Sequence, residues 1–290
     1  MSRPSSLIRG ASRVATIAAS AFLASAAVLA AHDFWIVPTA FTVAAGGDLE
    51  IHGQTSTSFP TSLSAVAPDR VAEARLLGAT SDERIADLST REKSLVLRHR
   101  PTTAGQRVVA VALASRAART TPARLQRYIA LEGAPELAER YARENAYPKA
   151  DSVTQVSAKF AKTIVEIGSR GPRAFSRVVG HPLEIVPVND PAALRTGDTL
   201  VVRLLYRGQP VAGAHLHAGA APRDSAHAAA RKDLSLTTGA DGVARVPIAE
   251  GGLWNVRTLH GAPAPGAGGE WEVFFATLVF TAGGGHQAHH

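Results

Sequence analysis

Eleven histidines and no cysteine define the chemistry that is open to this sequence. The only methionine is Met1, so a chain that has lost its first residues contains no sulfur. A metal ion would then be held by imidazole, carboxylate, backbone or amine groups, which suits Ni(II), Co(II), Cu(II) or Zn(II). Disulfides, a lipid on cysteine, a thiolate zinc site and thioether ligands for Cu(I) are excluded.

His32 follows an apolar N-terminal run. If a signal peptidase cuts after Ala31, the free amine and the imidazole of His32 form a bidentate chelate, to which one further imidazole or carboxylate can add. Histidine-brace copper proteins use this arrangement. A cut after Ala30 instead leaves His32 second in the chain, as an ordinary hydrogen-bonded histidine, and both cuts remain open.

His260 and Glu272 are candidate ligands from neighbouring segments near the end of the chain. His260 ends a predicted strand and Glu272 opens the next one, so we expect the two to be neighbours across a hairpin. They would meet His32 only if the N-terminal strand docks on the C-terminal domain. The alternative is an exposed histidine beside a surface glutamate.

His215 and His217 are separated by one residue, which on a strand puts both imidazoles on one face, within chelating reach of one ion. The same alternation is typical of the solvent face of an amphipathic strand. The C-terminal tail, 283–290, is rich in glycine and imidazole and could hold a metal loosely or be an incidental end. Its candidate ligands are His286, His289 and His290.

Enzyme signatures are missing from the sequence. We find no Gly-x-Ser-x-Gly elbow, no His-Glu-x-x-His and no phosphate-binding glycine loop, and cysteine nucleophiles are absent. Serine, histidine and aspartate occur, but their spacing assembles no triad. The sequence therefore predicts a binding protein with no catalytic residues.

The N-terminal segment is predicted to be a signal peptide, residues 1–31. Arginines at positions 3, 9 and 13 precede an uncharged, alanine-rich run, 14–31, that ends in small residues. An uncleaved membrane anchor is the alternative, because the run approaches the length that spans a bilayer. Cleavage would leave a soluble periplasmic chain, and without the three leader arginines the formal charge of +7 falls to +4. Basic residues do not cluster with aromatic ones, so a nucleic-acid partner is not expected.

The elements after the leader are predicted to be short antiparallel strands with one helical insertion. Alternating segments bounded by Gly, Pro, Ser and Asp favour strands from 48 to 114. A Thr-Pro pair followed by helical spacing predicts a helical hairpin at about 121–146. A Gly- and Arg-rich stretch, 168–177, then marks a domain boundary. We predict an all-β protein with two β-sandwich domains, 32–170 and 180–282, the second of immunoglobulin or transthyretin type.

Three motifs carry a resemblance to a known family: 32–38 (HDFWIVP), 180–187 (GHPLEIVP) and 271–278 (WEVFFATL). Together they resemble a bacterial exported family of unknown function, a DUF family formerly labelled as the nickel-uptake substrate-specific region. Its members often accompany nickel or cobalt transport systems. Three further segments, 208–214, 237–242 and 251–254, are similar to the carboxypeptidase regulatory-like β-sandwich.

The resemblance implies a periplasmic protein that binds or delivers a divalent transition metal, nickel or cobalt first, with a membrane metal-uptake transporter as partner. His52 is a candidate ligand only on this resemblance, since relatives show a His-Gly turn that soon reaches a proline, whereas here Pro60 comes seven residues after Gly53. Two alternatives stay open. One is a structural or ligand-binding sandwich without metal, and the other is a histidine-brace copper redox protein.

Overall fold

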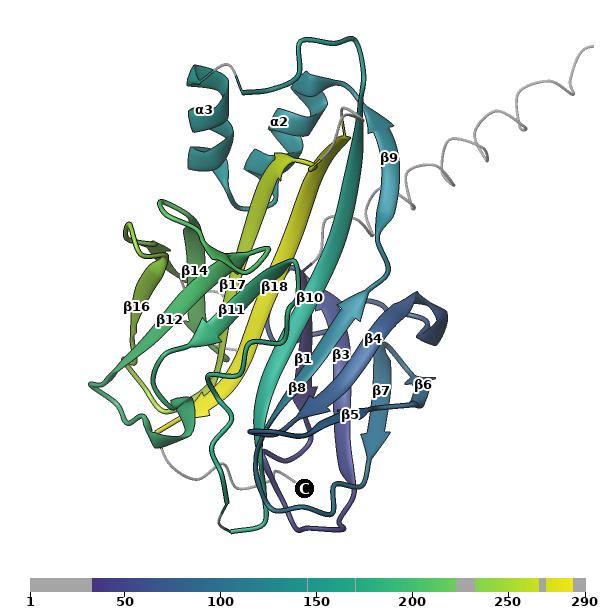
Figure 1. The fold of residues 1–290 in the computed structure, drawn as a ribbon, viewed down its shortest axis with the longest axis vertical. Helices are drawn as coiled ribbons and strands as arrows, with labels where there is room; N and C mark the ends of the chain where they lie inside the picture. The colour runs from purple at the N-terminus through teal and green to yellow at the C-terminus, as the bar shows by residue number, and fades with distance from the viewer. Residues whose placement is uncertain (1–32, 145, 170, 223–232, 266–269, 284–290) are drawn as a thin grey trace, which may run out of the picture. The chain divides into compact units, whose positions relative to one another are not determined.

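A long, mixed β-sheet forms the middle layer of the computed structural model, which describes residues 33–144, 146–169, 171–222, 233–265 and 270–283 (Figure 1). Residues 1–31, the predicted signal peptide, lie outside this description. The strand order of the long sheet is β15-β14-β17-β18-β10-β8-β4-β5, and β2 and β9 also pair with β10. These strands are β2 (Thr42–Val43), β4 (Val71–Leu77), β5 (Asp82–Arg84), β8 (Gly105–Leu113), β9 (Arg116–Thr120), β10 (Val153–Ile167), β14 (His215–Ala220), β15 (Leu234–Thr237), β17 (Gly252–Pro263) and β18 (Glu270–Ala282).

Two smaller sheets cover the long one, and they lie on opposite faces. Sheet A, in the order β1-β3-β7-β6, consists of β1 (Asp33–Pro38), β3 (Leu49–Ser56), β6 (Asp87–Arg91) and β7 (Ser94–His99). Sheet C consists of β11 (Leu183–Pro187), β12 (Thr199–Tyr206), β13 (Gln209–Pro210) and β16 (Val243–Pro247). Short 3₁₀ turns occur at Pro68–Arg70 and Pro191–Ala193.

The side-chain alternation of the long strands explains the two cores. Along β8, Val108 and Ala110 belong to the core beneath sheet C, whereas Val109 and Val111 belong to the core beneath sheet A. Successive side chains of a strand point to opposite faces, so a strand between two cores is buried on both faces. All nine residues of β8 are buried accordingly.

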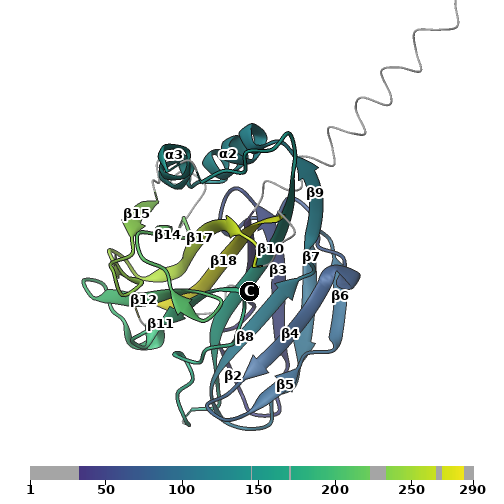
Figure 2. The same cartoon turned by 45° about the horizontal axis from the view of Figure 1, so that its top comes forward.

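A helical hairpin shares one face of the long sheet with sheet A (Figure 2). It consists of α2 (Pro122–Leu131) and α3 (Pro135–Arg143), and the Thr121 side chain caps α2 by accepting a hydrogen bond from the Arg124 amide, 3.3 Å away. Its core includes Leu125 and Ile129 of α2 and Val273 and Phe275 of β18. The predicted fold class, all-β with a helical hairpin, is confirmed.

The two predicted domains share the long sheet. β10, from the first, pairs in parallel with β18, from the second, between Thr154↔Glu270 and Thr163↔Val279. The chain from Asp33 onward forms one compact unit. The division into 32–170 and 180–282 therefore separates two sandwich cores that are built on a common sheet.

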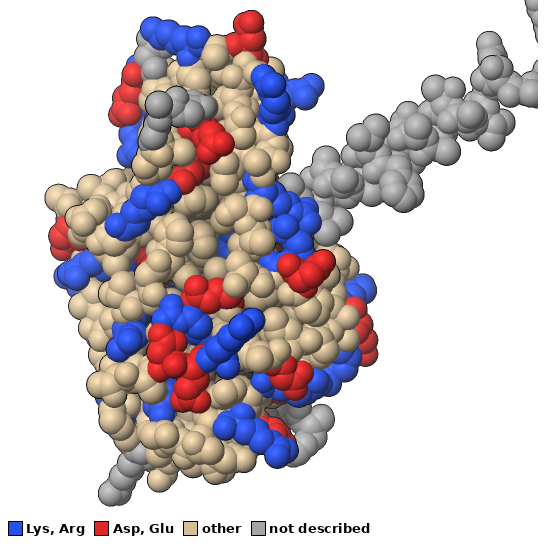
Figure 3. All heavy atoms as spheres, turned by 45° about the vertical axis from the view of Figure 1, so that its right-hand side comes forward, with Lys and Arg blue, Asp and Glu red and all other residues tan. Residues whose placement is uncertain are grey.

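Among the described residues, no helix is long and apolar enough to cross a membrane. Basic and acidic side chains are interspersed over much of the face drawn in Figure 3. This agrees with a charge that is spread over an ordinary surface.

A buried ion pair ties β10 to β11. The Lys162 ammonium lies 2.8 Å from Glu184 Oε1, and both side chains are almost fully buried. Glu184 also accepts hydrogen bonds from the backbone amides of Val179 and Gly180, at 2.8 and 2.9 Å. Burial alone would raise the pKa of Glu184, but the Lys162 charge and these donors outweigh it and hold the pKa below its ordinary value.

His181, next to this pair, is buried without a hydrogen-bond partner for either ring nitrogen in the described part of the chain. Its ring packs against Phe160, with the centroids 5.1 Å apart. Burial lowers the pKa of His181 to about 4, and Glu184 opposes this only in part. The structure thus keeps this histidine neutral in a low-dielectric setting.

We expect His181→Leu to raise the free energy of unfolding at pH 7 by about 1–3 kcal/mol, because it removes unpaired buried polar atoms at nearly constant volume. The unfolded chain protonates His181 near pH 6.5 and the native chain near 4, so stability is lost as the pH falls through this window. His181→Leu should lose less stability than the parent protein over this pH range. Urea titrations at pH 7 and pH 5 measure both effects, and a variant less stable than the parent at both pH values would contradict this account.

Candidate functional site

A cavity of about 1060 Å³ lies on the face of the long sheet that carries sheet A and the helical hairpin. Its floor is formed by β14 and β17, whose residues on this face alternate with those that enter the core beneath sheet C. One wall comes from β1 and the segment 57–61 after β3, and the other from the turn between α2 and α3. The cavity is therefore the space that the two covering layers leave between them.

The cavity lining is acidic overall. Arg257, on the floor, donates from Nη1 to Asp33 Oδ2 at 2.8 Å and from Nη2 to Asp233 Oδ2 at 2.7 Å. Glu136 of α3 is a third carboxylate in the lining. With neutral histidines, three carboxylates against one guanidinium give the described lining a net charge of −2. Such a lining favours a cationic ligand.

Gly219 of β14 makes room for one of these carboxylates. A Cβ atom at this position would lie 2.4 Å from Asp233 Oδ1, which is closer than atoms can approach. Glycine at this position therefore leaves room for the side-chain position from which Asp233 binds Arg257.

His215 and His217 lie side by side on the floor, with ring centroids 4.8 Å apart and ring planes at 77°. His217 Nε2 lies 2.8 Å from the Gly133 carbonyl oxygen. Because a carbonyl only accepts, Nε2 carries the proton and the lone pair is on Nδ1. Metal-ligating histidines commonly have this outer hydrogen bond to a backbone carbonyl, which fixes the tautomer and the ring orientation.

His215 Nε2 contacts Ser235 Oγ at 2.9 Å and lies 3.8 Å from Glu136 Oε2. Burial lowers the pKa of His215, against the opposing charge of Glu136, so the ring is neutral at pH 7 and can act as a ligand. Within the described ranges, no three His, Asp or Glu side chains are already arranged around one ion. The floor thus offers two imidazoles, with Glu136 as a nearby carboxylate.

The comparisons with known proteins identify a family for this chain. A family profile described as "Domain of unknown function (DUF4198)" matches residues 29–262, which is most of the chain. This chain belongs to the DUF4198 family. The matched region contains all the cavity residues from Asp33 to Arg257. No curated protein matches the sequence.

Solved structures resemble this DUF4198 protein only remotely. The D0-D1 domain of Intimin is 12% identical, with a TM-score of 0.19, over 86% of this chain and 97% of that one. Salmonella α2-macroglobulin reacted with methylamine is 10% identical, with a TM-score of 0.25, over 87% of this chain and 15% of that one. The Yersinia pseudotuberculosis adhesin InvE is 11% identical, with a TM-score of 0.20, over 86% and 59%. At such scores these likenesses carry no argument about function.

His260 and Glu272 both contact Tyr206, on the face of the long sheet opposite the cavity. The Tyr206 ring centroid lies 4.7 Å from that of His260, and the Tyr206 hydroxyl donates to Glu272 Oε2 at 2.5 Å. Arg207 forms an ion pair with the same carboxylate. Burial lowers the pKa of His260 to about 4, assisted by Arg140.

The hypothesis that these two residues converge with the N-terminal strand needs a correction. β1 does dock on β17 and β18, through the Asp33–Arg257 ion pair and a 2.7 Å bond from Thr277 Oγ1 to the Phe34 carbonyl. Arg257 and His260 are three residues apart on β17, so their side chains point to opposite faces. The N-terminal strand therefore approaches the cavity with the His215–His217 pair, not the side that holds His260.

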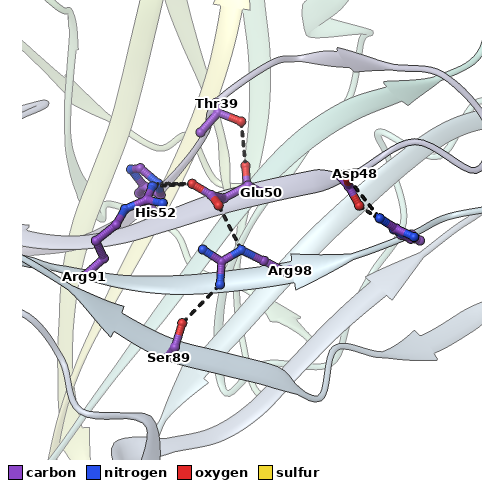
Figure 4. Close-up of polar contacts among 8 residues, drawn as sticks. Thr39, Asp48, Glu50, His52, Ser89, Arg91 and Arg98 are labelled. Carbon is purple, nitrogen blue, oxygen red and sulfur yellow. Dashed lines mark hydrogen bonds and ion pairs between the residues drawn. The ribbon is translucent and has the colours of Figure 1, made fainter.

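His52 belongs to an ion cluster on sheet A of this DUF4198 protein (Figure 4). Its Nε2 lies 2.8 Å from Glu50 Oε1 and 2.9 Å from Arg91 Nη2. Arg98 Nε donates to Glu50 Oε2 at 2.9 Å, and the hydrogen bonds of His52, Arg91 and Arg98 lower the pKa of Glu50 to about 2. The adjacent guanidinium opposes binding of a metal cation at this nitrogen.

Four candidate ligands lie outside the described residues, namely His32, His286, His289 and His290. The histidine-brace hypothesis rests on the first of them. Conversely, the cavity lining includes four residues that no sequence motif marks as ligands, namely Asp33, Asp233, Asn255 and Arg257. The one sequence signal for this group was that Asp33 directly follows His32 in the first family-like motif.

Proposed function

We propose that this protein binds one divalent transition-metal ion through His215 and His217 and delivers it, in the periplasm, to a membrane metal-uptake transporter. The observation that carries the proposal is the pair of adjacent imidazoles on the floor of an acidic cavity. Nickel and cobalt are the first candidates because of the resemblance described above, and copper and zinc suit the same ligands.

Three features of the pair support metal binding. The neutral state of His215 leaves it available as a ligand, the Gly133 carbonyl orients His217, and the net charge of −2 attracts a cation. None of them depends on the residues of the tail. Among the described residues, Glu136 can take one of the remaining coordination positions, and water or an exogenous ligand can take others.

Equilibrium dialysis with Ni(II), Co(II), Cu(II) and Zn(II) tests the proposal. The full chain with His286→Gln, His289→Gln and His290→Gln removes metal binding by the tail. We expect it to bind one equivalent of at least one metal with a Kd in the micromolar range or tighter. In the same background, His215→Ala with His217→Ala should weaken binding by at least about 100-fold, since losing one outer partner of a ligand already costs about 10–100-fold.

The matched control replaces two histidines outside the cavity, His52→Ala with His99→Ala. Both histidines lie on sheet A and contact carboxylates there or beside it, His52 with Glu50 of β3 and His99 with Glu83 of β5. We expect the control to keep the parent affinity. Absence of binding for all four metals, or equal loss in the control and the cavity variant, would overturn the proposal.

A ligand-binding sandwich without metal is the second candidate function. The observation that favours it is the cavity volume of about 1060 Å³, which suits a small organic molecule. A ligand bound only by the native state raises the melting temperature. An organic compound that does so without added metal, while none of the four ions changes the melting temperature, would favour this candidate.

A further inference from the structure

The cavity is far larger than a bound ion requires. Its volume of about 1060 Å³ is many times the roughly 30 Å³ that one water molecule occupies. The imidazole pair and Glu136 lie toward the helical hairpin. The part of the lining that adjoins β1 includes Trp35 and Phe59, whose rings meet edge to face at 5.3 Å, and Asn255, whereas Arg257 lies opposite His217 in the β14–β17 register. We call the part lined by Trp35, Phe59 and Asn255 the β1 subsite.

The metal ligands supplied by the described protein residues are too few to complete a coordination sphere. A four-coordinate ion held by two imidazoles has two open positions, and a six-coordinate ion has four. The described part of the chain places no third His, Asp or Glu around the same point. As far as the described residues go, the open positions are left to water, to a shifted Glu136 or to a molecule that enters with the metal.

Asn255 gives the β1 subsite an unmet hydrogen-bonding need. It is 3% exposed, lines the cavity, and its Oδ1 has no partner in the described part of the chain. A buried acceptor without a donor costs about 1–3 kcal/mol. An N–H group of a molecule in the subsite can supply that donor, whereas a bare metal ion at the histidine pair cannot.

The charge of the cavity lining distinguishes between metal–chelator complexes of different net charge. The described residues of the lining carry a net charge of −2, so they favour a complex that stays positive. A divalent ion with one amine-and-carboxylate chelator keeps a net positive charge and presents N–H groups. A divalent ion with a tricarboxylate such as citrate becomes negative and has no N–H donor.

We propose that the metal enters this cavity as a complex with a small amino-acid-type chelator, whose amine and carboxylate complete the coordination and whose body occupies the β1 subsite. This inference rests on the proposed function, because it takes the His215–His217 pair as the protein's share of the ligands. Asn255 then accepts a hydrogen bond from the amine of the chelator, and the space beside Trp35 and Phe59 takes the side-chain carbon atoms of chelators larger than glycine.

The test is equilibrium dialysis with Ni(II) and radiolabelled glycine, using the full chain with the three tail histidines replaced by Gln. Metal retention is measured first without glycine, and then with it. We expect about one glycine retained per bound ion, and no retention of radiolabelled citrate. Asn255→Leu should lower the amount of glycine retained per bound Ni(II) by about tenfold, the value of one hydrogen bond to a buried acceptor. The matched control is Gln209→Leu, which removes an exposed amide on β13.

The outcomes separate the inference from the proposed function. Ni(II) retained alone but stripped by glycine, or retained without labelled glycine, overturns the inference and leaves the proposed function standing. Citrate retained as well as glycine also overturns it. No retention of Ni(II) under either condition overturns both. Glycine retention that is equal in the parent and in Asn255→Leu contradicts the placement of the chelator in the β1 subsite.

Discussion

Lys162→Met is expected to lower the free energy of unfolding by about 3–5 kcal/mol, the usual result of removing one partner from a buried ion pair. Methionine fills nearly the same volume but leaves the Glu184 carboxylate buried without its counter-charge. The amides of Val179 and Gly180 still donate to it, and they do not neutralise it. Urea unfolding followed by circular dichroism measures the loss.

Two further variants isolate the unpaired charge. Lys162→Met with Glu184→Gln should recover part of the loss, because the amide is neutral and still accepts a hydrogen bond. Lys149→Met removes an exposed lysine and should change stability by less than about 0.5 kcal/mol. A loss of under about 1 kcal/mol for Lys162→Met would contradict a major role of this pair in joining β10 to β11.

Trp271→Ala is expected to cost about 3–5 kcal/mol as well, through the transfer and cavity effects of deleting a buried aromatic side chain. Trp271 is 1% exposed and stacks on Tyr147 at 5.5 Å, with Tyr141 edge-on at 5.6 Å. It therefore fixes the helical hairpin to β18. Because the hairpin supplies Gly133 and Glu136 to the cavity, we also expect weaker metal binding in the folded variant.

Phe280→Ala is the matched control for the Trp271 variant. Phe280 is 1% exposed and lies in the core beneath sheet C, on the face opposite the cavity. We expect a comparable loss of stability with unchanged metal affinity. Equal metal affinity in Trp271→Ala and Phe280→Ala would show that the hairpin does not position the His217 ring.

The local elements could be predicted from the sequence because their signals are local. The Thr121-Pro122 start and the apolar spacing after it identify the hairpin, which the structure places at Pro122–Leu131 and Pro135–Arg143. Strand alternation likewise assigns His215 and His217 to one face, and the structure has them there. These patterns depend on the residue periods of single elements, which the sequence displays directly.

The assembly of the sheet could not be predicted in the same way. Parallel pairing of β10 with β18 joins residues more than a hundred positions apart, and the apolar run of β18 indicates only that both its faces are buried. From the sequence alone, the run is predicted to be one strand of the C-terminal domain. Nothing in its composition specifies the strand of the other domain beside it.

The cavity depends on the same long-range contacts. Asp33 and Arg257, whose ion pair brings β1 to the floor, are 224 residues apart in the chain. His260 lies three residues after Arg257, so the two side chains point to opposite faces of the sheet. This excludes His260 from the cavity only because β1 packs beside Arg257, which the sequence does not reveal. For that reason the sequence could name His215 and His217 as a pair but not the acidic residues that surround them.

X-ray absorption at the metal edge of the nickel-loaded full chain, with the three tail histidines replaced by Gln, tests the central claim most directly. We expect scattering from two imidazole rings, and loss of that signal in His215→Ala with His217→Ala. A nickel site without imidazole scattering, or an unchanged spectrum in the double variant, would contradict the assignment of this pair as the metal ligands.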